Sequence, residues 1–346
     1  MIRLAWPDVG AEEAAAVAEV LESGRLTMGP KVAELEAELT RVCEVEHAVA
    51  VSSGTAALHL AVLALGIGPG DEVLVPAYTF PATANVVALA GARPVLVDVD
   101  PETMNMDPAK LTVTPRTKAI LAVDLFGRPA SLDELPDLPV IEDAAAALGA
   151  RYRGRPCGGL GVMGCLSFHP RKIVTTGEGG AVLTNSAAFA DSIRRMRHHG
   201  WKPPQYEDMP GPGFNYRLPD ILCAVGIPQV RRLEELLGRR EELAAAYEAR
   251  LAGLPIRLPS ADEGDRHGWQ AYVVQLGRRD EALAALRRAG IEAQIGTYAL
   301  HRLSAYADQG PFPGADLVYK RAMALPFHSR LAESDLDRVA EVLTKL

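Results

Sequence analysis

The sequence predicts an α/β protein, with a mostly parallel sheet covered by helices on both faces and a smaller carboxyl-terminal α/β domain. Short apolar runs alternate with helical stretches along the first half of the chain. These runs are nearly continuous, which is typical of strands buried on both faces of a parallel sheet. Farther on, a segment rich in proline and glycine comes before a long helical stretch, which indicates the passage into a second domain. Ligands of such sheets bind beyond the carboxyl ends of the strands.

The chain begins with two predicted amphipathic helices. Residues 11–23 are rich in alanine and glutamate and stop at Gly24, and residues 31–42 place four apolar side chains on one stripe. Further helices are predicted at residues 56–65 and 82–90. The apolar runs predict strands at residues 48–51, 72–75, 94–97, 119–123 and 140–141.

The domain boundary is predicted from a break in this pattern. Four prolines cluster with glycine between Pro203 and Gly213, and a helical run follows at residues 229–250. A strand and a helix are predicted after it, at residues 270–276 and 280–289. We therefore expect a large domain at residues 1–228, whose amino-terminal segment can pack on the small domain, and a small domain at residues 229–346.

The composition indicates an enzyme that acts on small molecules. The 346 residues are 48% hydrophobic and 23% charged, with a formal net charge of −8, which argues against nucleic acid or an anionic membrane as partner. No signal peptide or membrane-spanning apolar run is evident, so we expect a cytoplasmic protein. The four cysteines are scattered and lack metal-ligand spacing, so we expect reduced thiols and no metal.

Lys172 is the strongest candidate for chemistry. It follows an apolar run, with Ser167 before it and the glycines of Gly177–Gly180 after it. A lysine in such a place can lose its proton and attack a carbonyl, as a Schiff-base lysine does. The alternative is a solvated surface lysine, which is the commoner case for a single lysine.

Three other segments follow predicted strands. Ser52–Leu58 opens a helix with free amides and hydroxyls and suits a phosphate, although an ordinary helix cap has the same sequence. Asp143 precedes a run of alanines and could hold a ring nitrogen protonated, or it could be a structural acid. Phe80 could stack on that ring or belong to the core. Ser167 offers a second phosphate hydroxyl, and together these groups describe a site for pyridoxal phosphate.

The order and spacing of these segments resemble the DegT/DnrJ/EryC1/StrS family of sugar aminotransferases, which have the aspartate aminotransferase (type I) fold. The likeness extends along nearly the whole chain and is looser in the last third. The segments that carry it are Ser23–Pro30, Ser52–Leu58, Glu142–Ala145, Ser167–Lys172, Gly177–Gly180 and Phe214–Arg217.

The resemblance implies a role for each matching residue. Lys172 would hold pyridoxal 5'-phosphate covalently, Asp143 would pair with its ring nitrogen, and Phe80 would stack on the ring. Asn215 would reach the phosphate in the second subunit, which implies a homodimer with shared active sites. The phosphate itself would be bound by Thr55, Ala56 and Ser167.

Two positions depart from the family pattern, and three more are candidates for the substrate cleft. Ala146 stands where glutamine or histidine is usual near the cofactor's phenolic oxygen, and Asp124 stands where histidine is common. Loss of one hydrogen bond at Ala146 should weaken cofactor binding modestly, by roughly 1 kcal/mol. Arg217, Tyr298 and His301 are candidates for the sugar-nucleotide cleft, with purely structural roles as the alternative.

The function that the resemblance implies is transfer of an amino group from glutamate to a nucleotide-linked keto-deoxysugar by a ping-pong mechanism. Lys172 would act both as covalent anchor and as general acid and base. One alternative is a deoxysugar dehydratase, in which the family replaces this lysine with histidine. Another is a regulatory or binding member of the family without turnover, against which intact Lys172 and Asp143 argue.

Overall fold

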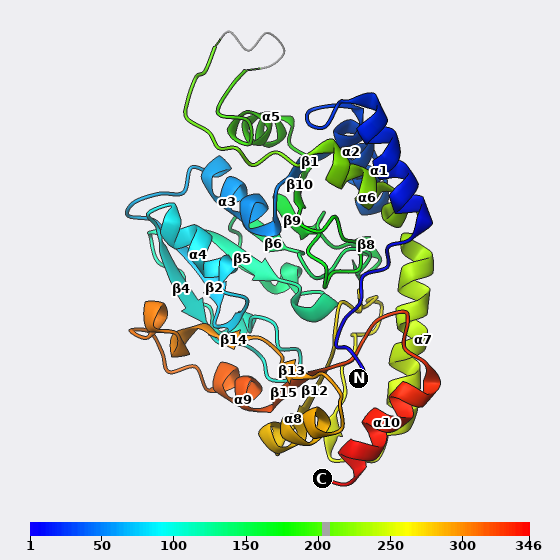
Figure 1. The fold of residues 1–346 in the computed structure, drawn as a ribbon. Coiled ribbons are helices and arrows are strands. Elements are labelled where there is room, and N and C mark those ends of the chain that lie inside the picture. Colours follow the sequence, from blue (N-terminus) through cyan, green and yellow to red (C-terminus); the bar gives the residue numbers. More distant parts are fainter. Residues whose placement is uncertain (203–207) are drawn as a thin grey trace.

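A computed structural model of the chain describes residues 1–202 and 208–346. Its main feature is a seven-stranded sheet in which six strands run parallel and β10 runs antiparallel to both its neighbours (Figure 1). The order across the sheet is β1 (His47–Val51), β10 (Gly180–Thr184), β9 (Met163–Ser167), β6 (Val140–Asp143), β5 (Thr117–Val123), β2 (Glu72–Pro76) and β4 (Arg93–Val97). This confirms the predicted α/β fold with a mostly parallel sheet.

Helices cover both faces of this sheet, and the side chains of β1 show why its sequence is apolar throughout. Val49 and Val51 belong to the core under one helical layer, whereas Ala48 and Ala50 belong to the core under the other. The first layer consists of α3 (Gly54–Ala64), α4 (Ala82–Leu89) and α5 (Ala187–Met196). The second contains α1 (Ala11–Ser23), α2 (Pro30–Cys43) and α6 (Asp220–Arg231). Burial on both sides leaves no position for an alternating polar residue.

The predicted helix at residues 229–250 was wrong in its start and its continuity. Two helices occupy this region, α6 and α7 (Leu233–Leu251), and they meet at Arg232, whose φ of −99° and ψ of 23° interrupt the helix. Asp220 in the first turn of α6 accepts the backbone N–H groups of Gly29 and Lys31, at 2.7 and 2.9 Å, and thereby caps α2. The predicted break at residues 203–213 lies partly outside the described residues.

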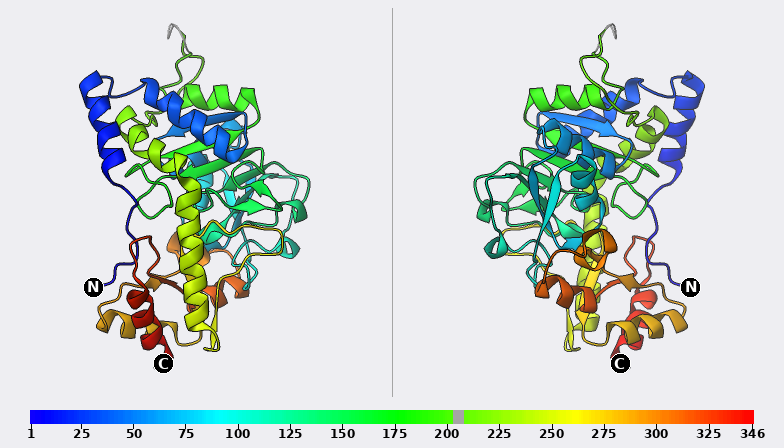
Figure 2. Two further views of the ribbon diagram at one scale, coloured as in Figure 1. Left: turned by 90° about the vertical axis from the view of Figure 1, so that its right-hand side faces the viewer. Right: turned by 90° about the vertical axis from the view of Figure 1, so that its left-hand side faces the viewer.

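A second, four-stranded sheet lies beside the carboxyl-terminal end of α7, away from the seven-stranded sheet (Figures 1 and 2). All its pairings are antiparallel, in the order β11 (Ile256–Arg257), β12 (Tyr272–Leu276), β15 (Ala322–Leu325) and β13 (Gln294–Ile295). It packs with α7, α8 (Arg279–Arg288) and α10 (Glu333–Thr344), and α9 (Pro313–Arg321) lies beside it. The amino terminus joins this body, because the N–H of Ile2 donates to the carbonyl of Gly290 at 2.9 Å. The boundary between residues 228 and 229 stays a prediction.

Short elements complete the fold. The paired strands β3 (Tyr78–Thr79) and β14 (Tyr298–Ala299) join the two bodies, and β7 (Arg151–Tyr152) pairs with β8 (Arg155–Pro156). The 3-10 turns are Pro108–Lys110, Leu125–Gly127, Leu132–Glu134, Leu300–Arg302 and Ser304–Tyr306. All four cysteines are buried and free, as expected. Within the described part of the chain, no helix is both long and apolar enough to cross a membrane.

Candidate active site

A cavity of about 710 Å³ opens at the carboxyl ends of the parallel strands, facing the four-stranded sheet. The first body contributes six of the predicted residues or their neighbours in sequence: Ser53, Thr55, Phe80, Asp143, Ser167 and Lys172. The second body contributes residues of β13 and β15, namely Gln294, Ile295, Ala324 and Leu325. The cavity therefore depends on both bodies, and it lies where ligands of parallel sheets bind.

One end of the cavity suits an anion. The helix α3 begins there, and the Ser53 hydroxyl caps it by accepting the N–H of Ala56 at 3.0 Å. A Cβ atom on Gly54 would lie 2.8 Å from the Cβ of Ser167, so glycine is required for the helix start to lie against the end of β9. Ser53, Thr55 and Ser167 all line the cavity, and Ser167 lies against the start of α3. Phosphate groups are favoured at such a helix amino terminus.

Asp143 is the buried acid of the site. It is the last residue of β6 and is 6% exposed. Its Oδ2 accepts the hydroxyl of Thr83 at 2.9 Å, and its Oδ1 accepts the N–H of Ala145 at 3.2 Å. Burial raises the pKa of Asp143, while the Thr83 hydrogen bond, the Lys172 charge and the Ala145 N–H oppose the rise. The carboxyl group is therefore held in place and can be paired with a cation in the cavity.

Lys172 lies in the loop after β9, where its N–H donates to the carbonyl of His169 at 2.8 Å. Burial lowers the pKa of the Lys172 amine, Asp143 raises it, and the Arg171 charge lowers it again. A lowered pKa makes the neutral amine easier to reach, and the neutral amine is the form that attacks a carbonyl. Lys172 and Asp143 therefore form an electrostatically coupled amine and acid at the same cavity.

Two aromatic side chains form an open wall of the cavity. Phe80 is 61% exposed and Tyr298 is 41% exposed, and their rings meet edge to face with centroids 6.3 Å apart. Their strands hold them together, because Thr79 of β3 is paired with Tyr298 of β14. Large aromatics this exposed beside a cavity are typical of a surface that a ligand or partner covers.

The donor set fits pyridoxal phosphate. The anion site with three hydroxyls would take the phosphate group, Asp143 would face the ring nitrogen, and the amine of Lys172 would meet the aldehyde. The small side chains of Ala145 and Ala146 leave room for a flat ring, and the exposed ring of Phe80 in the same cavity could stack on it.

Asn215 and Arg217 lie apart from this cavity. Asn215 is exposed and forms an isolated antiparallel bridge with His198. Arg217 is half-buried, and its Nη1 lies 2.7 Å from Nδ1 of His198. Neither residue lines the cavity of its own chain. The structure therefore does not bring them together with Lys172 and Asp143, and their assigned roles stay predictions.

Two other predicted residues also lie outside the cavity lining. Ala56 is buried, and its N–H is already taken up by the Ser53 cap. His301 packs edge to face on Phe312, and its Nε2 lies 3.3 Å from a carboxylate oxygen of Asp316. Their assigned roles toward phosphate and substrate stay predictions.

Several lining residues were not predicted. His169, Arg171 and Glu178 lie within six residues of Lys172 in the sequence. This proximity to the predicted lysine could have indicated that they line the same cavity. Others come from distant segments and carry no local signal, namely Leu4, Ala5, Gln270, Gln294, Thr297 and Phe327.

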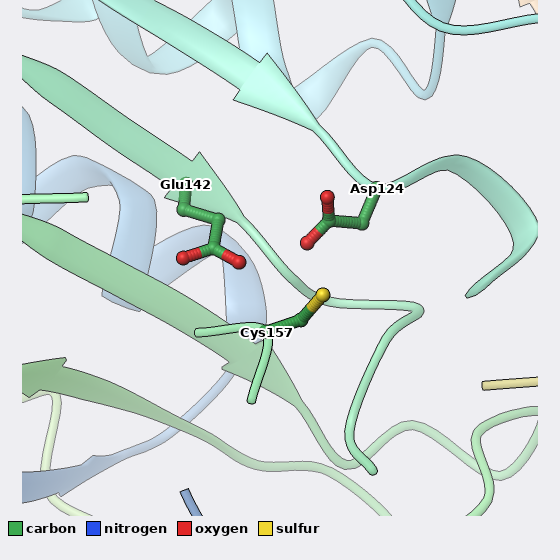
Figure 3. Close-up of side chains that lie close together, drawn as sticks. All are labelled: Asp124, Glu142 and Cys157. Atoms are coloured by element: carbon green, nitrogen blue, oxygen red, sulfur yellow. The ribbon is translucent and has the colours of Figure 1, made fainter. Parts of the chain in front are cut away.

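A cluster of three buried side chains, Asp124, Glu142 and Cys157, lies behind the site (Figure 3). One carboxylate oxygen of Asp124, one of Glu142 and the Sγ atom of Cys157 all lie within 4.8 Å of one another. Glu142 accepts the N–H groups of Gly158 and Leu160, at 2.5 and 2.9 Å, which suits an ionised carboxylate. The carboxyl group of Asp124 is buried and points toward Glu142 (Figure 3).

These surroundings determine which of the two acids holds a proton. Burial, together with the adjacent Glu142 charge, raises the pKa of Asp124 well above its usual value. Burial also raises the pKa of Glu142, but a hydrogen bond from Asp124 and the backbone amides oppose that rise. Burial raises the pKa of the Cys157 thiol well above its usual value too. These surroundings therefore favour a proton on Asp124 and an ionised Glu142.

The protonated state of Asp124 predicts a specific pH dependence of stability. Above the pKa of an unfolded aspartate, about 3.9, the folded chain keeps a proton that the unfolded chain releases. The free energy of unfolding therefore falls as pH rises toward the folded pKa of Asp124, by at most about 1.4 kcal/mol per pH unit. Asp124→Asn keeps a donor toward Glu142 but cannot ionise. Above about pH 4, the Tm of this variant should therefore rise relative to the Tm of the wild type as pH increases.

The control for this measurement is Asp308→Asn, which removes an exposed acid. Its Tm should follow that of the wild type across the same pH range. Parallel Tm profiles for Asp124→Asn and the wild type would show that Asp124 is ionised in the folded protein.

Comparison with known proteins gives one family and several similar structures. The model of the DegT/DnrJ/EryC1/StrS aminotransferase family matches residues 7–344. An aminotransferase of that description from Brucella abortus is 36% identical, with a TM-score of 0.91, over 96% of this chain and 95% of that chain. DesV from S. venezuelae, solved in complex with a ketimine intermediate, is 38% identical, with a TM-score of 0.92, over 96% and 94% of the two chains. A putative sugar aminotransferase from Streptococcus pneumoniae in its PMP form is 28% identical, with a TM-score of 0.95, over 100% and 98%.

Proposed function

Because the chain belongs to the DegT/DnrJ/EryC1/StrS aminotransferase family, we propose that it moves an amino group from glutamate to a nucleotide-linked keto-deoxysugar. The protein is an enzyme that uses pyridoxal phosphate, as its structural neighbours do. One observation carries the proposal furthest. A single cavity holds an amine of lowered pKa, a buried acid and a helix amino terminus surrounded by hydroxyls.

The residues of the site divide the work of binding and proton transfer. Ser53, Thr55 and Ser167 hold the phosphate end, and Asp143 keeps the ring nitrogen protonated by remaining an anion beside it. When bound, pyridoxal phosphate supplies the carbonyl group that takes up the amine and a ring that accepts electrons. Lys172 would anchor the cofactor covalently, and its free amine would carry the proton to and from the reacting carbon.

Two substrates can use this cavity in turn. In the first half-reaction the C–NH₂ group of glutamate becomes the C=O group of 2-oxoglutarate, and in the second the C=O group of the sugar becomes C–NH₂. No external oxidant or reductant is needed. The cavity of about 710 Å³ falls within the usual range for ligand sites. It is lined by a single set of reacting groups, Lys172 and Asp143, and by the exposed aromatic side chains of Phe80 and Tyr298. This arrangement supports alternating occupancy, which is a ping-pong mechanism.

The test is a screen of nucleotide-linked keto-sugars with glutamate, in which 2-oxoglutarate is measured. The first half-reaction is followed separately, without a sugar, by the change in the cofactor's visible absorbance. We expect glutamate alone to give one equivalent of 2-oxoglutarate per site, and a matching keto-sugar to give continuous turnover. If glutamate leaves the absorbance unchanged while another amino acid alters it, the proposed donor is wrong. If glutamate reacts but only keto acids or other non-sugar acceptors are aminated, the proposed acceptor is wrong.

We also propose that the active enzyme is a homodimer in which Asn215 serves the partner's site. The proposal is supported by the position of Asn215, which is exposed and outside the cavity of its own chain. A site shared in this way predicts complementation between two damaged chains. In a hybrid of Lys172→Ala and Asn215→Ala chains, one site receives both defects and the other receives neither. A one-to-one mixture should recover about a quarter of wild-type activity, because about half of the dimers are hybrids with one intact site each.

The matched control for complementation mixes Lys172→Ala with Thr55→Ala chains. Both of these residues line the cavity of one chain, so every site in that hybrid is damaged and no activity should return. Hybrid formation is verified with differently tagged chains. If verified hybrids of the impaired Asn215→Ala chain gain nothing, Asn215 serves its own subunit.

A further inference from the structure

We propose that Thr83 and Thr79 form a two-hydroxyl relay that positions Asp143 and connects it to the strand carrying the aromatic wall. The relay lies in the first body. Thr79 belongs to β3, Thr83 to the first turn of α4, and Asp143 to the end of β6. All three side chains are buried, with 1%, 0% and 6% of their surface exposed.

The direction of the hydrogen bonds follows from the number of available protons. A threonine hydroxyl has one proton to donate and can also accept. Thr83 donates to Oδ2 of Asp143 at 2.9 Å, so its proton is used there. Its Oγ1 lies 3.3 Å from Oγ1 of Thr79, and Thr79 must therefore be the donor of that contact. The relay thus runs from Thr79 through Thr83 to the carboxylate.

The charges around Asp143 explain why such a donor matters. The Lys172 charge acts on Asp143 from the loop after β9, Cys165 lies on the neighbouring strand β9, and Asp124, whose pKa is raised by burial, follows β5. Among the described residues, Thr83 is the only side chain with a hydrogen bond to this carboxylate. A hydrogen bond to the ionised form stabilises it, and so keeps a proton on the cofactor's ring nitrogen rather than on the acid.

The relay also reaches the opposite wall of the cavity. Thr79 is paired with Tyr298 across the two short strands that join the bodies, and Phe80 is the next residue in the chain. Thr79 contacts the hydroxyl that holds Asp143, and the next residue, Phe80, belongs to the aromatic wall. The positions of the acid and of the aromatic wall are therefore linked through two consecutive residues. Thr83 and Thr79 are positioning residues, since they act on the cofactor through Asp143 and the strand.

The experiment measures the ring nitrogen directly, in the resting enzyme. Holoenzyme is prepared with pyridoxal phosphate labelled with ¹⁵N in its ring, and the protonation of that nitrogen is followed by NMR as pH is varied. Thr83→Val keeps the side-chain shape but cannot donate, so Asp143 becomes the stronger base. The proton should move from the ring nitrogen toward the acid, and the ratio of nitrogen-protonated to acid-protonated forms, read from the ¹⁵N chemical shift, should fall by up to about tenfold. Thr83→Ser restores the hydroxyl and should restore the wild-type value. Thr79→Val should give a smaller shift in the same direction.

The inference rests on the cofactor site of the proposed function but not on its substrates, because no substrate is added. Failure of the glutamate and sugar assays would leave this measurement unaffected. An unchanged ¹⁵N chemical shift of the ring nitrogen in Thr83→Val, with Tm within a few degrees of wild type, would overturn the relay. A shift that Thr83→Ser fails to reverse would also overturn it, since loss of packing and not of the hydroxyl would then be the cause.

Discussion

Replacing Lys172 with alanine should leave a folded protein that still binds pyridoxal phosphate through its phosphate contacts but has lost turnover. The expected loss in kcat is on the order of 10²–10⁴-fold or more, because the proton carrier and the covalent anchor disappear together. Steady-state rates measure the loss. Borohydride reduction of the wild-type holoenzyme, followed by peptide mapping, should place the cofactor on the peptide that contains Lys172.

The control is Lys110→Ala, which removes an exposed lysine far along the chain from the site. It should keep wild-type rates and the wild-type labelling pattern. Small primary amines added to Lys172→Ala should restore part of the rate if the missing function is proton transfer. Labelling at a different lysine in the wild type would contradict the assignment.

Replacing Asp143 with asparagine should lower turnover far more than it lowers cofactor occupancy. The fold should survive, because asparagine has the same shape and its one amide oxygen can still accept a hydrogen bond from either Thr83 or Ala145. The negative charge that holds the ring nitrogen protonated is lost, and removal of one such preorganised group typically costs about 10²–10³-fold in kcat. Titration with pyridoxal phosphate measures occupancy, and single-turnover kinetics with an amino donor measure the chemical step.

Two comparisons make this result specific. Asp137→Asn removes an exposed acid and should behave like the wild type. Reconstitution of Asp143→Asn with a cofactor methylated at the ring nitrogen supplies a permanent positive charge, and it should recover part of the lost rate. Near-normal turnover of Asp143→Asn with ordinary cofactor would show that Asp143 has a structural role alone.

The elements of the large sheet could be predicted because their signals are local. Strands such as β2 and β5 are buried on both faces, so their sequences are continuous apolar runs. The start of α3 could be predicted because Ser53 caps its own helix. The division between α6 and α7 was missed, because it depends on the backbone at Arg232, which periodicity does not reveal.

The candidate site divides in the same way. Lys172, Asp143, Thr55, Ser167 and Phe80 follow strand ends, and parallel strands bring their carboxyl ends to one edge of the sheet. The sequence could therefore indicate that they meet. It contained no comparable signal for residues of the second body or the amino terminus, such as Thr297 and Leu4.

By itself, the sequence determined the fold class, the residue types of the cofactor site and the strand ends that carry them, because these depend on neighbours along the chain. Only the tertiary structure decided the protonation and the partners of those residues. The pKa of Asp124 is raised because this residue is buried beside Glu142, and Asp143 is held by a hydroxyl 60 residues away in the chain. Both effects depend on distance in space and on the removal of water, and neither quantity is a property of a short stretch of sequence.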